Sequence, residues 1–393
     1  MVDRNNRRNK RVVNKVTDII SNVRQRRDQA LLEYTNKFDK VKLSVKDLKV
    51  SEREINASFQ GLDSAMILAL KEAIDNVFKF YKKQLPKNFK LKTDEGRKIE
   101  EKFLPLERVG IYIPGGQAPL VSSVYMCAIP AIVAGVKDLV LTSPPDKKGF
   151  LNPYILAVAS ILKIKEVYKV GGAQAVAGLA VGTDTIKRVD KIVGPGNEYV
   201  TEAKRQLFGT TGIDMLAGPS EIAIVAGKKA NLDYIVKDLE AQTEHRSGIG
   251  LVVVLSKPVF NQLKKVNIPN SYLVKAANID EAAGIINDFA PEHLEVMVPN
   301  PSGFVKKIHN AGAIFIGDYS PVPLGDYIAG PSHVLPTSET ARFFSGLGVY
   351  DFLKRVHVVS YSKKALVKDV NFLEKIAGLE GMTKHIESVK VRL

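Results

Sequence analysis

The sequence predicts an α/β protein built on two parallel sheets, with helical segments at both ends of the chain. Short apolar runs alternate with helix-like segments from residue 108 onward, and this alternation is typical of parallel sheets. At least eight such runs span roughly 230 residues, which favours two sheets over one. The segments before and after this region are helical and charged.

The expected elements follow one another in a regular order. Residues 1–40 are polar and helical, and residues 51–85 place apolar residues at helical spacing behind the capping sequence SERE. After about residue 345 the chain becomes helical again, and this tail is too short for a domain of its own. The predicted strands lie in residues 108–116, 138–145, 166–172, 190–196, 220–227, 249–256, 293–298 and 311–321.

The composition is that of a globular intracellular protein. The chain has 393 residues, of which 45% are hydrophobic and 25% charged. A single cysteine, Cys127, excludes an intrachain disulfide and suits a reducing cytosol, so a cytoplasmic location is expected. The basic N-terminus has no apolar segment behind it that would indicate a signal peptide. Residues 119–136 are weakly polar but contain two prolines and two serines, which favours a core helix over a membrane span.

The net charge of +15 raises the question of a nucleic-acid partner. Basic residues are dense in the first 27 positions and spread out elsewhere, and no RNP-like motif, zinc finger or recognition helix is present in the sequence. We therefore interpret the charge as a solvated basic surface and expect no nucleic-acid partner.

Three turns between a predicted strand and a helix are rich in glycine, and each has a polar or aromatic residue close by: Tyr112, Gln174 and Asn197. Glycine lets the backbone approach a ligand, and a helix N-terminus behind it favours an anion such as a pyrophosphate. None of the turns is a G-x-G-x-x-G loop, and tight turns use glycine anyway. The side chains of these three residues could form hydrogen bonds with a ribose or with the amide edge of a ligand. The turns are Gly115-Gly116, Gly171-Gly172 and Gly194-Pro195-Gly196.

Gln242 and His245 continue the apolar stripe of a predicted helix. A neutral amide and an imidazole one turn apart are compatible with a hydrogen-bonded core pair. They are also compatible with a metal site, because a histidine nitrogen and an amide oxygen both serve as ligands.

Further candidates lie in the second half of the chain. Glu292 and His293 are adjacent, just before a predicted strand, and could divide two proton-transfer roles or form an ordinary loop pair. Asp318 and Asp326 both stand in a Gly-Asp-Tyr sequence, and either could be a metal carboxylate. Glu380 and His385 follow a helix near the C-terminus, where a histidine is usually solvated. The dense Gly-Pro loop after Asp326 also contains a histidine, which has no assigned role.

These pieces resemble the histidinol dehydrogenase family over about residues 20–393. The resemblance is carried, in this order along the chain, by VDKIVGPGNEYVTEAKRQ, IDMLAGPSEIAIVA, AQTEH, APEHLEVMV, GDYIAGPSHVLPT and EGMTKH. Members of that family oxidise L-histidinol to L-histidine through an aldehyde, using two NAD⁺ and one Zn²⁺ per site. They are homodimers with interlocked subunits.

The resemblance implies a role for each candidate. Glu292 and His293 match the catalytic acid–base pair: His293 takes the hydroxyl proton while hydride passes to NAD⁺, and Glu292 activates water to hydrate the aldehyde. Zinc mainly positions the substrate. The implied zinc ligands are Gln242, His245, Asp326 and His385 of the partner subunit; the NAD contacts are Tyr112, Gln174 and Asn197; the substrate contacts are Ser220, Gln242, His245, His293, Asp326, Glu380 and His385.

The resemblance also implies a domain organisation based on two incomplete Rossmann-like domains. Residues 1–20 would form an N-terminal helical arm, and residues 346–393 a tail that packs on the partner subunit. The first domain would combine residues 21–111 with residues 221–345, and the second would comprise residues 112–220.

Two alternatives remain. A sibling zinc- and NAD-dependent dehydrogenase acting on another small diol would keep the metal and the Glu-His pair but need not recognise imidazole. A nucleic-acid-binding protein would show salt-dependent binding that is independent of zinc.

Overall fold

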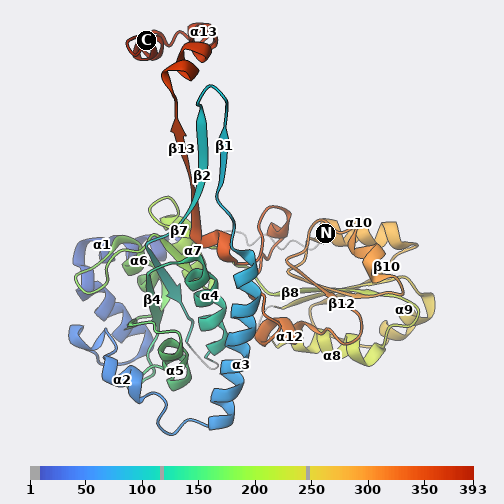
Figure 1. The fold of residues 1–393 in the computed structure, drawn as a ribbon. Coiled ribbons are helices and arrows are strands. Elements are labelled where there is room, and N and C mark those ends of the chain that lie inside the picture. The colour runs from blue at the N-terminus through green and yellow to red at the C-terminus, as the bar shows by residue number, and fades with distance from the viewer. Residues whose placement is uncertain (1–8, 116–118, 245–247) are drawn as a thin grey trace. The chain divides into compact units, whose positions relative to one another are not determined.

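A computed structural model describes residues 9–115, 119–244 and 248–393 of the chain. The chain divides into two compact units, of which the first contains Met1–Gln84 and Leu106–Phe352 and the second Leu85–Pro105 and Leu353–Leu393. Both parallel sheets lie in the first unit (Figure 1). The predicted fold class, two parallel sheets with helical segments at both ends, is confirmed, whereas the interlocked dimer stays a prediction.

The first sheet has five parallel strands in the order β5-β4-β3-β6-β7. Counted along the chain, this is the order 3-2-1-4-5, which doubly wound dinucleotide-binding sheets share in their first five strands. Such sheets bind ligands beyond the carboxyl ends of the strands where the order reverses, here between β3 and β6. The strands are β3 (Arg108–Tyr112), β4 (Asp138–Ser143), β5 (Glu166–Lys169), β6 (Lys191–Val193) and β7 (Gly212–Ile213).

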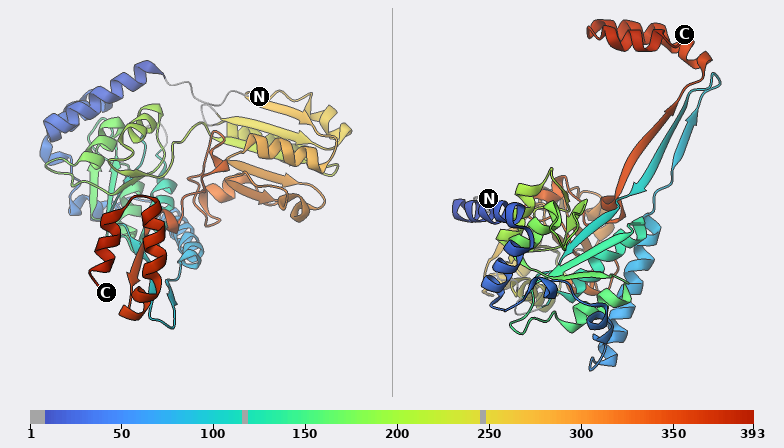
Figure 2. Two further views of the ribbon diagram at one scale, coloured as in Figure 1. Left: turned by 90° about the horizontal axis from the view of Figure 1, so that it is seen from above. Right: turned by 90° about the vertical axis from the view of Figure 1, so that its left-hand side faces the viewer.

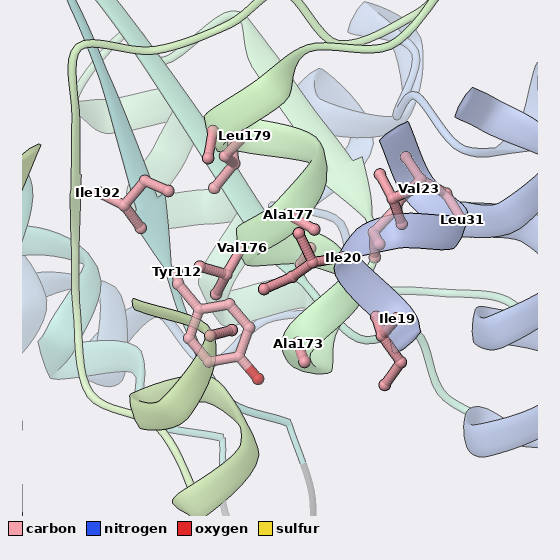
Figure 3. Packing of buried hydrophobic residues seen from close by; sticks show 14 of the residues in the cluster. Ile19, Ile20, Val23, Leu31, Tyr112, Ala173, Val176, Ala177, Leu179 and Ile192 are labelled. Carbon is pink, nitrogen blue, oxygen red and sulfur yellow. The ribbon is translucent and has the colours of Figure 1, made fainter. Parts of the chain in front are cut away.

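An apolar core joins this sheet to three helices, α1 (Lys10–Asp39), α6 (Gly172–Val181) and α7 (Glu198–Leu207). Tyr112, Ile19 and Ala173 lie together at one end of that core (Figure 3). Helix α4 (Val121–Ala134) packs on β3 and beside α5 (Pro153–Ile161). Because α4 is almost entirely buried, the prediction of a core helix there is confirmed.

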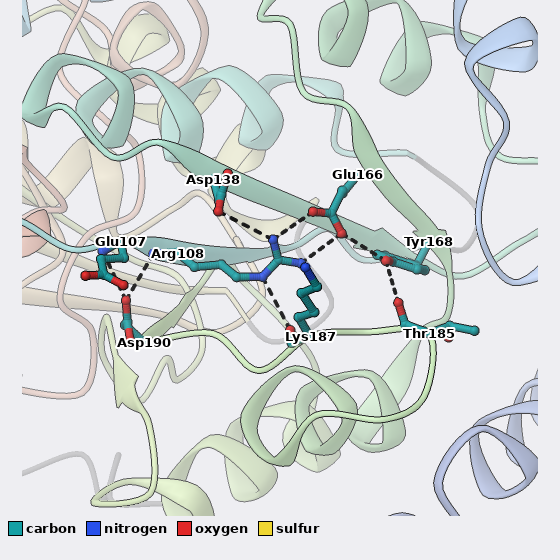
Figure 4. Close-up of polar contacts among 8 residues, drawn as sticks. All are labelled: Glu107, Arg108, Asp138, Glu166, Tyr168, Thr185, Lys187 and Asp190. Atoms are coloured by element: carbon teal, nitrogen blue, oxygen red, sulfur yellow. Dashed lines mark hydrogen bonds and ion pairs between the residues drawn. The ribbon is translucent and has the colours of Figure 1, made fainter.

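A polar network ties one end of β3 to its neighbours (Figure 4). The Arg108 guanidinium donates to both oxygens of Glu166, at 2.7 and 2.8 Å, and lies 4.0 Å from Asp138. Tyr168 donates to the same Glu166 carboxylate at 3.0 Å. This bidentate pair joins β3 to β5 across β4, and it fixes their orientation as well as contributing energy.

The second sheet repeats the topology of the first, with strand order β10-β9-β8-β11-β12 and all strands parallel. Helices α10 (Ile279–Phe289) and α11 (Pro301–Val305) share one apolar core with it, and α8 (Leu232–Thr243), α9 (Lys257–Leu263) and α12 (Val322–Tyr327) share another. No long sequence repeat indicates that the two sheets share this topology. The strands are β8 (Glu221–Ala226), β9 (Ile249–Val254), β10 (Ser271–Lys275), β11 (His293–Met297) and β12 (Ala313–Ile316).

All eight predicted strands are present, and the sequence missed two further parallel strands, β7 and β10. The N-terminal part is helical as predicted, with α2 (Glu52–Ala57) and α3 (Ser64–Tyr81) following α1. The capping sequence acts as expected, since the Ser51 side chain accepts a hydrogen bond from the Glu54 amide at 3.1 Å.

The second unit is an antiparallel sheet followed by two helices (Figures 1 and 2). Strand β2 (Lys98–Pro105) lies between β1 (Phe89–Lys92) and β13 (Leu353–Ser360), and α13 (Lys363–Leu379) packs against α14 (Thr383–Lys390). The expectation that the chain is helical throughout after residue 345 is therefore wrong for residues 353–360. Their β-branched residues pair with β2, a partner far away in the sequence.

The predicted division into domains stays a prediction, although two observations bear on its boundaries. The boundary between residues 111 and 112 falls within β3, and α1 packs against α6 and α7. Among the residues that the structure describes, no helix is long and apolar enough to cross a membrane.

Candidate functional site

A cavity of about 380 Å³, here called the first-sheet cavity, lies at the carboxyl ends of the strands of the first sheet. Tyr112 is the last residue of β3, Gln174 lies in the first turn of α6, and Asn197 is the N-cap of α7. All three line the cavity, so the structure brings the predicted cofactor-contacting residues together. They meet where the strand order reverses, as expected for a ligand site in such a sheet.

The polar groups of the first-sheet cavity have hydrogen-bonding capacity to spare. The Tyr112 hydroxyl accepts from the Gly172 amide at 3.2 Å, and burial raises the pKa of Tyr112 to about 12, so its proton stays available for donation. The Oε1 atom of Gln174 is buried without a hydrogen-bond partner among the described residues. Asn197 uses Oδ1 to cap α7, accepting from the Tyr199 amide at 3.0 Å, and this leaves its amide nitrogen free of that role.

The Gly194-Pro195-Gly196 turn is held in place by a buried ion pair. The Lys204 ammonium donates to Asp214 at 2.7 Å and to the Gly194 oxygen at 2.5 Å, while the Gly194 amide donates to Asp214 at 2.8 Å. Gly194 has φ +117°, and a Cβ there would lie 2.1 Å from the backbone carbonyl oxygen of Tyr112. The turn therefore requires glycine for its close approach to β3, rather than for a phosphate loop.

The same turn borders a second cavity of about 230 Å³, here called the Glu-His cavity. Ser220, Glu292, His293 and Asp326 also line it. Ser220 and Glu292 directly precede β8 and β11, so this cavity lies at the amino ends of these strands. The sequence correctly placed Glu292 and His293 at the end of a strand. They lie at its amino end, however, whereas ligands of open α/β sheets usually bind at the carboxyl ends of the strands.

Glu292 is a buried carboxylate supported by two donors. The Ser220 hydroxyl and the Glu221 amide both donate to its Oε2 atom, at 2.7 and 2.9 Å. Burial raises the pKa of Glu292, and these hydrogen bonds together with nearby His293 oppose that rise. A carboxylate balanced in this way can take up and release a proton.

His293 is oriented by a backbone oxygen. Its Nδ1 atom lies 3.0 Å from the carbonyl oxygen of Glu221, which can only accept, so Nδ1 carries the proton in the neutral ring. Nε2 is then the basic nitrogen; it is buried, forms no hydrogen bond with the described residues and lies 3.7 Å from Asp326 Oδ1. Burial lowers the pKa of His293, but Glu292 and Asp326 more than offset this and raise it to about 9. A cation beside Asp326 would oppose that rise.

The positions of the residues predicted as metal ligands follow from the contacts of residues close to them in the sequence. Burial and, after it, the charge of nearby Asp238 on α8 raise the pKa of Glu295 on β11 to about 8, and Oε1 of Glu295 accepts from the Val322 amide at 3.0 Å. Gln242 follows Asp238 by one helical turn, Asp326 follows Val322 by one turn, and His293 precedes Glu295 by two strand positions. The three side chains therefore share one side of the sheet, towards its amino edge.

Two of the residues predicted as metal ligands lie at this edge. Asp326 offers a carboxylate oxygen and the buried Gln242 an amide oxygen, both of which are atoms that can ligate a metal ion. The described residues contain no group of three His, Cys, Asp or Glu that could hold a metal. His245, the ligand predicted next to Gln242, lies outside the described residues.

The remaining candidates are placed separately. Asp318 is exposed in the turn after β12, whereas Asp326 lines the Glu-His cavity. Glu380 is the C-cap of α13, and His385 lies on α14; both are exposed and belong to the second unit. Their roles stay predictions.

Sequence reasoning gave no role to His333, which also lines the Glu-His cavity. Its Nδ1 atom lies 2.8 Å from the backbone oxygen of Asp326, and its Nε2 lies 3.0 Å from the Ser123 hydroxyl on α4. His333 thus joins the Asp326 segment to the helix beside the first sheet. The feature of the sequence that could have identified His333 as a site residue is its place in a Gly-Pro loop near Asp326.

Comparisons with known proteins point in one direction. The family model described as histidinol dehydrogenase matches residues 2–393. Histidinol dehydrogenase from Clostridium acetobutylicum is 43% identical over 99% of this chain and 94% of its own length. The protein of that name from Caldanaerobacter subterraneus subsp. tengcongensis is 46% identical over 98% and 93%. The crystal structure of histidinol dehydrogenase from Elizabethkingia anophelis superposes with a TM-score of 0.91 at 36% identity, covering 96% of this chain and 91% of that chain.

Proposed function

The chain belongs to the histidinol dehydrogenase family, and we propose that it uses the two cavities to oxidise L-histidinol to L-histidine through histidinal with two NAD⁺. It is thus an oxidoreductase of histidine biosynthesis. One observation carries the proposed division of labour. The Gly194-Pro195-Gly196 turn borders the cavity that His293 lines, and Asn197, directly after the turn, lines the first-sheet cavity. A cofactor in the first-sheet cavity would need to extend only past this turn to reach a substrate at His293.

His293 and Glu292 divide the proton transfers. Nε2 of His293 takes the proton of the substrate hydroxyl as the first hydride leaves its carbon. Glu292 then takes a proton from the water that adds to the aldehyde while His293 returns its proton to the aldehyde oxygen. His293, neutral again, takes a hydroxyl proton of the resulting hydrate as the second hydride leaves. Bound NAD⁺ accepts the hydride in each oxidation. Tyr112, Gln174 and Asn197 would hold it through their spare donors and acceptors.

Zinc would be held by Gln242, His245 and Asp326, with His385 of the partner subunit. When bound, it would position the amine and imidazole of the substrate next to His293. Ser220 and Glu380 would complete the substrate contacts. One carboxylate among four ligands leaves most of the metal charge uncompensated, which suits neutral nitrogen donors from the substrate.

The apolar surface of the second unit supports the proposed dimer. Phe372, Ile376 and Leu379 recur along one side of α13 and are 65%, 61% and 90% exposed. Large apolar side chains gathered on one face favour a partner surface. A second copy of the chain would cover that face and supply His385 and Glu380 to the neighbouring site.

Chelation tests the metal part of this proposal. NADH formation from L-histidinol should disappear when zinc is removed and return when zinc is restored, whereas Asp326→Asn should bind less zinc and stay inactive. A folded, zinc-loaded protein that forms no NADH from L-histidinol would contradict the substrate, and it would favour a related dehydrogenase of another diol.

Subunit mixing tests the shared site. His293→Asn and His385→Asn should each be almost inactive alone, but random exchange of their subunits would leave about a quarter of the sites intact. Recovered activity near that fraction supports the shared site. If exchange is verified and no activity returns, each site belongs to a single subunit.

A further inference from the structure

Asp39 is a half-buried aspartate in the first-sheet cavity that no role considered so far uses. It is the last residue of α1 and lines the cavity with Tyr112, Gln174 and Asn197. Its Oδ2 atom is buried without a hydrogen-bond partner among the described residues, and burial raises the pKa of Asp39 to about 6. A buried carboxylate without donors is costly for a fold to keep, so the position favours a ligand that supplies them.

Lys15 is the other charged residue among the described lining of this cavity. Helix α1 breaks at Arg27, where φ is 50° and ψ is −128°, and this break lets Lys15 and Asp39 line one cavity although they are far apart along the helix. The Lys15 ammonium lies 5.1 Å from the centre of the Tyr199 ring and 5.4 Å from that of Phe38. The cavity therefore offers a cation for a phosphate and an anion for hydroxyl groups.

The position of α1 indicates which half of a dinucleotide these groups would meet. The described residues that line the Glu-His cavity include the Gly194-Pro195-Gly196 turn but none from α1. The nicotinamide must reach that turn to accept hydride from a substrate at His293. Lys15 and Asp39 would then face the adenosine half, which lies further from the reacting carbon.

We propose that Asp39 accepts hydrogen bonds from the adenosine ribose hydroxyls of NAD⁺ and thereby selects NAD⁺ over NADP⁺; this rests on the proposed placement of NAD⁺ in the first-sheet cavity. A carboxylate only accepts, and the 2′- and 3′-hydroxyls of a ribose can both donate to it. A 2′-phosphate would replace a donor with negative charge beside an anion whose Oδ2 atom has no other hydrogen-bond partner among the described residues. Selection therefore combines an attraction for NAD⁺ with a repulsion of NADP⁺.

The test compares Asp39→Asn with Asn197→Ala. Each variant is assayed for kcat/KM with NAD⁺ and with NADP⁺, and the binding of each cofactor is measured by calorimetry. Asp39→Asn removes the charge at almost constant shape, so the ratio of NADP⁺ to NAD⁺ efficiency should rise about 10-fold or more. Asn197→Ala should weaken both cofactors and leave their ratio unchanged, since its amide does not distinguish a phosphate at the 2′ position. If Asp39→Asn does not fold, Asp39→Ser gives the same comparison.

The outcomes separate this proposal from the cavity assignment. A raised ratio in the Asp39 variant together with a constant ratio in the Asn197 variant supports the proposal. If Asn197→Ala weakens NAD⁺ binding but the Asp39 variant keeps the original ratio, Asp39 is not the selecting residue and the cavity assignment stands. If neither variant changes the binding of either cofactor, NAD⁺ does not occupy the first-sheet cavity, and both claims fail.

Discussion

The Nδ1 atom of His293 lies 3.0 Å from the backbone oxygen of Glu221, and this contact determines which ring nitrogen can act as a base. A carbonyl oxygen cannot donate, so the proton of the neutral ring is held on Nδ1, and the basic Nε2 lies 3.7 Å from Asp326 Oδ1. The side chain of the preceding residue, Glu292, accepts a hydrogen bond from the Glu221 amide at 2.9 Å. One peptide segment at the start of β8 thus orients both residues of the proposed catalytic pair.

Replacing His293 should abolish most of the activity without unfolding the protein. His293→Asn removes the base, and kcat should fall by about 10²–10⁴-fold for both histidinol and histidinal, because each oxidation needs a proton acceptor. His309→Asn, at an exposed position, is the matched control and should keep the original kcat. Steady-state NADH formation with each substrate measures the effect. A loss below 10-fold would mean that another group is the base.

Replacing Glu292 should separate the two oxidations. Glu292→Gln keeps the shape but cannot take a proton from water, so histidinal oxidation should fall more than histidinol oxidation, and the yield should move from two NADH per histidinol towards one. Ser220→Ala removes one of the two donors to Glu292 and should have a smaller effect in the same direction. Stopped-flow measurements starting from each substrate would show the difference. Equal losses in both steps would argue against a special role in hydration.

The buried pair of Lys204 and Asp214 makes a prediction about stability. Asp214→Asn leaves the Lys204 ammonium buried without its counter-charge, which should cost about 3–5 kcal/mol of unfolding free energy. Adding Lys204→Met should return part of that loss, because no isolated charge then remains. Urea unfolding of both single variants and the double variant measures the coupling. Strictly additive losses would show that the pair does not act as a unit.

The ion pair of Arg108 and Glu166 should make stability depend on acid pH. The Arg108 guanidinium is the main reason that the pKa of Glu166 is lowered to about 2 (Figure 4). A carboxyl with a lowered pKa contributes stability above its unfolded value of about 4.3, and that contribution disappears as pH falls towards 2. Glu166→Gln should therefore be less stable than the original by about 1–3 kcal/mol at pH 7.

The control for this pH prediction is Asp138→Asn, since Asp138 is 62% exposed and lies 4.0 Å from Arg108. It should change stability by less than about 1 kcal/mol at pH 7. Unfolding free energies measured from pH 7 down to pH 3 should show the gap between the original protein and Glu166→Gln closing with acid. A gap that stays constant would mean that the substitution acts through packing.

The sequence was sufficient for all the parallel strands except β7 and β10, because each of those it predicted is a short apolar run bounded by turn residues. It was not sufficient for β13, whose partner β2 lies some 250 positions earlier, a pairing that no local pattern reveals. Helical spacing predicts that Gln242 continues the apolar stripe of α8. In the structure Gln242 is buried together with Ile235 and Leu239, as that spacing predicts. The role of the Glu221 carbonyl could not be read at all, since backbone atoms carry no sequence signal.

Asp39 and Lys204 illustrate the same limit for side chains. An aspartate at a helix end and a lysine within a charged helix are usually solvated, yet one lies in a cavity and the other is almost fully buried. What distinguishes them is the set of neighbours brought in by distant segments: the carboxyl end of β3 for Asp39, and Asp214 with the Gly194 turn for Lys204. Spacing along one helix cannot supply that information.

The stoichiometry of NADH to L-histidinol tests the central claim most directly. A limiting, known amount of L-histidinol is converted to completion by the zinc-loaded protein with excess NAD⁺, and NADH and L-histidine are both counted. Complete oxidation of the alcohol to the carboxylate should give two NADH and one L-histidine for each histidinol consumed. One NADH with accumulation of histidinal, or no reaction at all, would contradict it.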